Sequence, residues 1–167
     1  MNPSGLVLRP ATSADIPCLR DLASRIWHAC YPGIICGDQI VYMLGWMYSA
    51  ERLAADMERG VRFAIAEVDG VPSGYLATEA DPGSGTLHLH KLYLLPECQG
   101  RGLGQAMLEE VGRIAAAAGL AQVELRVNKS NHRALRAYRR AGFEVRAAVV
   151  ADIGGGFVMD DFILVRR

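Results

Sequence analysis

The sequence lacks an excess of charge of either sign and lacks a long apolar run. Lys plus Arg and Asp plus Glu each total 18 of 167 residues, so the formal net charge is +0. A neutral chain without a basic run is not expected to bind nucleic acid through its phosphates. No apolar stretch approaches the length of about 18 residues that a membrane span needs. Residues 1–5 lack the basic and apolar regions of a targeting signal, so we expect a cytoplasmic protein without membrane contacts.

Cysteine is also scarce. The four cysteines Cys18, Cys30, Cys36 and Cys98 show neither the CxxC pairs of a zinc site nor the density of a disulfide scaffold. We therefore expect free thiols and no metal. Cys98 has no paired histidine in the sequence, which disfavours a covalent route through this thiol. The length fits one domain over residues 1–167.

One glycine-rich segment stands out against this background. Gln99-Gly100-Arg101-Gly102-Leu103-Gly104 follows the alternating apolar run 87–95 and opens a helix-like stretch. The first N–H groups of a helix have no intrahelical partner and lie at the positive end of the helix dipole. Glycines let an anion approach these groups closely. The segment predicts a phosphate-binding turn at a helix N-terminus.

The glycine spacing disfavours two common nucleotide sites. A dinucleotide fingerprint has the pattern G-x-G-x-x-G, but counting from Gly100 or Gly102 places Gln105 or Met107 at the last glycine position. A triphosphate loop needs Gly-Lys-Ser/Thr, whereas Gly104 is followed by Gln105. The phosphate therefore belongs to a different ligand.

A second segment identifies that ligand through a family resemblance. The pattern Gln-x-x-Gly-x-Gly at 99–104 is followed downstream by Asn131-x-x-Ala134-x-x-x-Tyr138-x-x-x-Gly142-Phe143. Together these signatures resemble those of the GNAT superfamily of acetyl-CoA-dependent N-acetyltransferases. With the strand before them they cover residues 87–143, roughly a third of the chain. The resemblance implies acetyl-CoA as co-substrate and acetyl transfer to an amine.

The resemblance also implies the fold. It predicts a single-domain α/β protein of mixed α+β type, with a mostly antiparallel seven-stranded sheet, four to five flanking helices, and strands four and five splayed apart. Residue patterns agree, because hairpins come first and strand-helix-strand-helix-strand units follow. The predicted strands are 6–9, 61–68, 71–79, 86–95, 122–127, 143–150 and 157–165; the helices are one capped by Thr12 or Ser13 and then 38–46, 50–59, 103–118 and 131–141.

The cofactor residues are expectations drawn from the resemblance. Backbone N–H groups of residues 100–104 should hold the pyrophosphate, and the Leu94 N–H should face the thioester carbonyl. Asn131 should hold the pantetheine arm, although a role as helix N-cap alone stays open. The expected contacts are Leu92, Tyr93, Leu94, Gln99, Gly100, Arg101, Gly102, Leu103, Gly104, Gln105, Asn131 and Tyr138.

Four residues are candidates for proton transfer. The resemblance implies that Tyr138, seven residues after Asn131, brings its phenol to the CoA sulfur, unless it only packs in the core. A phenol is neutral at physiological pH and can donate to the leaving thiolate. His88 and His90 lie two apart on one strand, hence on one face, and resemble the histidine pair of serotonin N-acetyltransferase. They are candidate bases, or simply solvent-facing residues. Glu79 is an alternative base acting through water.

The acceptor is the least determined part. Trp27 and Tyr31 are candidate substrate contacts, with core packing or a dimer surface as the alternative. The patterns Trp27-x-x-x-Tyr31 and Tyr48-Ser49-x-Glu51-x-Leu53, together with Asp160-Asp161, loosely resemble bacterial spermidine/spermine acetyltransferases. Asp160 or Asp161 is thus a candidate to attract a cationic amine, with a solvated acidic pair on a strand as the alternative. A small amine or polyamine is the favoured acceptor. A protein N-terminus or lysine, and a CoA-binding sensor without turnover, remain alternatives, and a homodimer is possible.

Overall fold

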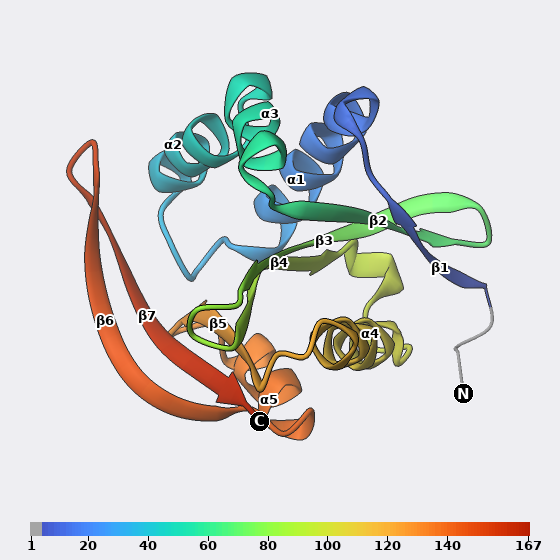
Figure 1. The fold of residues 1–167 in the computed structure, drawn as a ribbon. Coiled ribbons are helices and arrows are strands. Elements are labelled where there is room, and N and C mark those ends of the chain that lie inside the picture. The colour runs from blue at the N-terminus through green and yellow to red at the C-terminus, as the bar shows by residue number, and fades with distance from the viewer. Residues whose placement is uncertain (1–4) are drawn as a thin grey trace.

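Seven strands form one sheet in the computed structural model, which describes residues 5–167 (Figure 1). Their spatial order is β1-β2-β3-β4-β5-β7-β6, and every neighbouring pair is antiparallel except β4 and β5. The strands are β1 Leu6–Pro10, β2 Arg62–Val68, β3 Val71–Asp81, β4 Thr86–Leu94, β5 Gln122–Asn128, β6 Glu144–Gly154 and β7 Phe157–Arg166. This confirms the predicted mixed, mostly antiparallel sheet.

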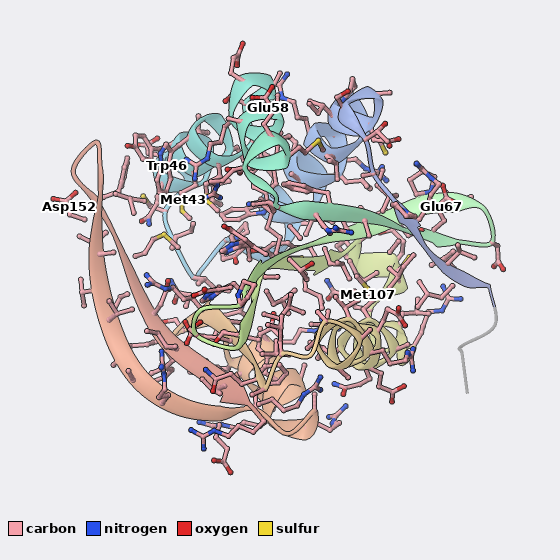
Figure 2. The ribbon with its side chains drawn as sticks, viewed as in Figure 1. Met43, Trp46, Glu58, Glu67, Met107 and Asp152 are labelled. Carbon is pink, nitrogen blue, oxygen red and sulfur yellow. The ribbon has the colours of Figure 1, made fainter. Side chains whose placement is uncertain are left out.

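Helices cover both faces of the sheet. α1 to α3 lie on one face, and α4 and α5 lie on the other (Figure 1). Met107 of α4 is fully buried between that helix and the sheet (Figure 2). The bounds are α1 Ile16–Cys30, α2 Gly37–Met47, α3 Ala50–Arg59, α4 Leu103–Ala117 and α5 His132–Arg140, with short 3₁₀ turns η1 Ser13–Asp15 and η2 Pro96–Cys98.

The local signals of the sequence explain most of these boundaries. Ser49 caps α3 by accepting a hydrogen bond from the Arg52 N–H at 3.1 Å, and Gly60 ends the helix with φ +109°. The Asp69-Gly70 turn has positive φ at both residues, as a tight hairpin requires. Thr12 precedes η1 rather than α1 itself, so the first helix begins at Ile16, later than its cap residue suggested.

The parallel pair β4 and β5 separates partway along its length. Pairing runs from Thr86 opposite Gln122 to Leu89 opposite Leu125 and then stops. The last five residues of β4 and the last three of β5 therefore have no pairing with each other. The predicted splay of strands four and five is confirmed, and it opens the sheet where the glycine-rich segment begins.

A bulge in β4 changes which side chains share a face. Ala77 pairs with Lys91 and Thr78 pairs with Leu89, so His90 is an extra residue without a partner on β3. Since side chains alternate along a strand, the extra residue moves Lys91 and everything after it to the opposite face. The face of β4 towards α1 to α3 consequently carries His88, His90, Lys91 and Tyr93 together.

The β6–β7 hairpin extends beyond the sheet and curves up to α2 (Figure 1). Tyr42 of α2 donates its hydroxyl to the carbonyl of Ile153 at 2.6 Å, and Gln39 donates to the carbonyl of Val158 at 2.9 Å. β6 is longer than the predicted 143–150, because the hairpin continues to this contact. The hairpin tip and α2 thus enclose one side of the space above the splayed strands.

Candidate active site

A row of unpaired backbone donors marks the glycine-rich loop. Gly100 and Gly102 have φ of +74° and +79°, conformations that side chains other than glycine rarely adopt. Gly102 is the N-cap of α4 and offers no side chain to the helix. The N–H groups of residues 100–105 have no acceptor among residues 5–167, since the first helical bond runs from Ala106 to the Gly102 carbonyl. Arg101 is exposed beside them.

The splayed end of β4 presents a second backbone donor. The Leu95 N–H donates to the Ser73 carbonyl of the β3 side at 2.8 Å. Successive N–H groups of an extended chain point in opposite directions, so the Leu94 N–H points away from β3 and into the gap beside β5. That is the position expected for a donor to a thioester carbonyl.

Three of the predicted cofactor-binding residues form hydrogen bonds within the protein itself. Gln99 donates to the Leu94 carbonyl at 3.0 Å and fixes the loop to the end of β4. Gln105 donates to the Ala137 carbonyl at 3.0 Å and connects α4 to α5. The Asn131 side chain accepts from the Ala134 N–H at 3.2 Å and so caps α5. Their contacts with a cofactor stay predictions.

One cavity of about 1280 Å³ joins this cleft to the space under the hairpin. Its cleft side includes Leu92, Tyr93, Leu94, Gln99, Gly104, Asn131 and Tyr138. Its far side is formed by α1, α2, α3 and β7, with large apolar residues that include Met43 and Trp46 (Figure 2). Donor-side and acceptor-side candidates therefore line one cavity.

Tyr138 projects from α5 into the cavity. Its ring packs edge-on against Phe143 at 5.8 Å, which fixes the direction of the phenol. Among the described residues its hydroxyl has no hydrogen-bond partner. Burial raises the pKa of the Tyr138 phenol, and the nearby Tyr31 phenol adds to the shift. The phenol is thus neutral at physiological pH, and its role as the acid stays a prediction.

Trp27 and Tyr31 form part of an aromatic floor. The two rings stack with centroids 4.3 Å apart, and the Tyr31 hydroxyl lies 3.1 Å from the Tyr93 hydroxyl. Trp27 is only 1% exposed, so it supports Tyr31 more than it meets solvent. Burial raises the pKa of Tyr31 to about 12, and the charge of Asp161 contributes.

The two histidines lie side by side, each facing a carboxylate. Their rings are nearly parallel, with centroids 5.9 Å apart. His90 Nε2 lies 2.8 Å from Glu79, and His88 Nδ1 lies 3.7 Å from Glu124. Partial burial lowers the pKa of His90, although Glu79 opposes the shift. The prediction that both histidines share a face is confirmed, and Glu79 joins them.

Lys91 is a cavity residue that the sequence did not reveal. It is 7% exposed, and its ammonium lies 5.3 Å from the Tyr48 ring and 5.7 Å from the Phe63 ring. Burial lowers its pKa to about 8. Alternation without a bulge places Lys91 on the opposite face from His88, so no pattern in the sequence indicates this position.

Asp161 and Asp160 have different surroundings. Asp160 is paired with Lys129 at 2.5 Å and its side chain is 54% exposed. Asp161 is 3% exposed and lines the cavity. Of the two acidic residues that the sequence could not separate, only Asp161 is placed to meet a ligand in this cavity.

Two further searches of residues 5–167 gave negative results. No group of His, Cys, Asp or Glu side chains there has the arrangement of a metal site. In the same part of the chain, no helix is long and apolar enough to cross a membrane.

The fold and the cleft together define an acyl-transfer enzyme, and comparison with known proteins agrees. A model of the acetyltransferase (GNAT) family matches residues 21–143. An uncharacterized N-acetyltransferase of Mycobacterium tuberculosis is 30% identical over 157 residues, which cover 92% of this chain and 97% of that protein. A spermidine N(1)-acetyltransferase of Thermoplasma acidophilum is 25% identical, covering 92% of this chain and 94% of that protein.

A solved structure shows the same fold. The crystal structure of the PaiA N-acetyltransferase from Thermoplasma acidophilum, in complex with coenzyme A, has a TM-score of 0.82 and 24% identity, and the match covers 97% of this chain and 98% of that one. This chain belongs to the acetyltransferase (GNAT) family. It is an N-acetyltransferase that uses acetyl-CoA as co-substrate and transfers the acetyl group to an amine, as the two sequence signatures implied.

Proposed function

We propose that the acceptor is a primary amino group of a small molecule, with polyamines as the favoured class. The observation that carries this proposal is the cavity that joins the cofactor cleft to a space lined by α1, α2, α3 and β7, which the hairpin contacts with α2 close on one side. A small amine fits inside such a space, whereas a protein N-terminus needs an open groove. The hairpin contacts with α2 close the side where a groove would continue.

On the donor side, the proposal assigns the free N–H groups of residues 100–105 and Arg101 to the pyrophosphate. These groups sit at the positive end of the α4 dipole, which favours an anion there. The main-chain groups of Leu92 and Leu94, in the part of β4 that is not paired with β5, are assigned to the pantetheine arm and the thioester carbonyl. The Leu94 N–H then stabilises the negative charge that develops on the carbonyl oxygen.

For the chemical step, we assign Tyr138 as the acid. The neutral amine attacks the thioester carbon directly, the carbon–sulfur bond breaks, and the phenol protonates the leaving thiolate. His88, His90 and Glu79 are assigned to a relay that passes a proton from the cavity to solvent through water. The closeness of the two rings and the Glu79 contact support this assignment.

On the acceptor side, Tyr31 and Trp27 are assigned to the wall that receives the amine. Polyamines are favoured because the carboxylate of Asp161 lines the cavity without an ion pair among residues 5–167. Glu79 and Glu124 also line it, each already paired with an arginine, at 3.5 Å and 2.6 Å. The relative named a spermidine N(1)-acetyltransferase adds support for this class. Apolar residues such as Met43 suit the methylene segments between the charges of a polyamine.

CoA release with a panel of acceptors tests the proposal. The panel contains spermidine, spermine, arylalkylamines, amino acids and peptides with free N-termini or lysines. We expect the highest kcat/KM with a small amine and within that group with a polyamine. Preference for a peptide would replace the proposal by protein acetylation, and tight acetyl-CoA binding without turnover of any acceptor would favour a sensor.

We also propose that the protein is cytoplasmic and forms a homodimer. All four cysteines are unpaired thiols in the structure, as a reducing compartment favours. Sedimentation of the purified protein across a concentration series measures the assembly state directly.

A further inference from the structure

Asp161 is a buried carboxylate that the fold leaves unpaired. It is 3% exposed, yet no hydrogen bond or ion pair within residues 5–167 holds its side chain. A buried carboxylate without a partner is costly, so such a group is usually retained for binding or catalysis. It lines the acceptor side of the cavity together with Met159, two residues earlier on the same face of β7.

The sheet register places Asp161 beside the splayed end of β5, at the same end of the sheet as Leu94, whereas His88 lies in the paired part of β4. Asp161 pairs with Asn128 of β5, three residues beyond Leu125, whose partner on β4 is Leu89. Asn128 and Leu94 therefore both lie beyond the point at which β4 and β5 separate.

The histidines lie further back on the same strand. His88 is opposite Glu124, six residues or roughly 20 Å along β4 from Leu94, and His90 is four residues away. The pair therefore suits a path to solvent better than first contact with the attacking amine.

The groups around Asp161 connect it to the reacting end of the cavity. The charge of Asp161 contributes to the raised pKa of Tyr31. The Tyr31 hydroxyl contacts the Tyr93 hydroxyl, and the Tyr31 phenol contributes to the raised pKa of Tyr138. Burial raises the pKa of Asp161 itself; Asp160 adds to that shift, and Arg126 and Lys129 oppose it. A carboxylate in this environment has a stronger tendency to take up a proton.

We propose that Asp161 is a further catalytic residue, which binds the ammonium group of the acceptor and takes its proton before the amine attacks. This inference rests on the proposed function and names the group that meets the substrate. The ammonium nitrogen loses two protons in the complete reaction. One goes to the sulfur of CoA by way of Tyr138, and the other goes to Asp161 and then to solvent through the histidine relay. The nitrogen–carbon bond forms, the carbon–sulfur bond breaks, and no oxidant or reductant takes part.

Asp161→Asn tests the inference, with Asp160→Asn as the matched control. The substrate is the amine that the wild-type protein acetylates fastest in the panel. At pH 7 we expect Asp161→Asn to lower kcat/KM at least 100-fold, as for loss of a general base. The loss should shrink about tenfold per pH unit as the pH rises towards the pKa of the amine. At higher pH more of the amine is already deprotonated, so the reaction needs a general base less. Asp160→Asn removes a neighbouring charge that acts on the pKa of Asp161 but leaves the Asp161 carboxylate in place, so its loss should be far smaller than that of Asp161→Asn.

Two controls separate chemistry from structure. Acetyl-CoA affinity measured by calorimetry should be the same for both variants and the wild type, and the Asp161→Asn protein should unfold at no lower temperature than the wild type. A loss of the same size at every pH, or no loss at all, would overturn the inference and leave the proposed function standing. A wild-type protein that acetylates no amine would remove the proposed function and the inference with it.

Discussion

The donor side and the acceptor side of the cavity are built in different ways. The donor side is made mainly of backbone N–H groups from one continuous segment, residues 100–105, with the Leu94 N–H beside it. The acceptor side is made of side chains from α1, α2, α3, β4 and β7. In the proposed function, the backbone donors recognise a group common to all acetyl-CoA reactions, whereas the scattered side chains set the choice of amine.

The two sides also differ in what they cost the fold. The loop donors are open to an anion or water and need no buried charge. The acceptor side carries two buried ionisable side chains, Lys91 and Asp161, which are 7% and 3% exposed. Burying an unpaired charge lowers stability, so the acceptor side is where function and stability are expected to conflict.

The largest expected effect comes from a substitution that disrupts only the donor side of the cavity. Gly102→Val places a β-branched residue at φ +79° in the loop, which strains the backbone and disturbs the aligned N–H groups. We expect acetyl-CoA binding measured by calorimetry to weaken about 100-fold or more. Gly119→Val is the control, because Gly119 has φ +69° just beyond the other end of α4 and also has open space around it. Equal weakening in both variants would contradict a role for the loop.

The next effect lies where the two sides meet. Tyr138→Phe removes the phenol but keeps the ring packed on Phe143. We expect kcat to fall tenfold or more while the KM values for both substrates stay within about twofold, since the proton is needed only as the thiolate leaves. Tyr75→Phe is the control, because its hydroxyl donates to Tyr48 at 2.8 Å away from the cavity. Unchanged turnover of Tyr138→Phe at neutral and high pH would remove the phenol from the mechanism.

A smaller effect is expected at the histidine relay. We expect His88→Ala and His90→Ala each to lower kcat/KM about threefold to tenfold near pH 6.5, with a change in the acidic limb of the pH-rate profile. The acidic limb arises because a histidine must be neutral to accept a proton. The lowered pKa of His90 keeps its ring neutral down to a lower pH than that of a free histidine. If both variants keep the wild-type limb, the histidines take no part in proton transfer.

The smallest effect concerns stability and measures how much the buried charge of Lys91 on the acceptor side lowers the free energy of unfolding. Lys91 has a pKa of about 8 in the folded protein and 10.5 as a free side chain. The unfolded chain therefore binds more protons between these values, so this penalty is full below pH 8 and disappears as the pH rises to 10.5. Lys91→Met should raise the free energy of unfolding by about 1–3 kcal/mol at pH 7, with the gain shrinking above pH 8. Urea unfolding at pH 7 and 10 measures both values; a gain independent of pH would contradict this explanation.

Most elements of the fold could be predicted from local patterns. The apolar positions Ile16, Leu19, Leu22, Ala23, Ile26 and Trp27 recur at helical spacing, and all are buried in α1. Ser49, Gly60 and the Asp69-Gly70 turn act through contacts with their immediate neighbours. The length of β6 could not be predicted, because the contacts of Tyr42 and Gln39 with the hairpin join residues more than a hundred positions apart.

The site divides in the same way. The sequence by itself determined the family, the co-substrate and the loop, because a turn with two glycines and a helix N-terminus is formed by consecutive residues. Only the tertiary structure decided that Lys91 shares a face with the histidines, since this follows from a bulge against β3. It also decided that Asp161 lines the cavity while Asp160 pairs with Lys129. Backbone recognition is local in sequence, whereas a pocket that selects an acceptor needs side chains that only packing brings together.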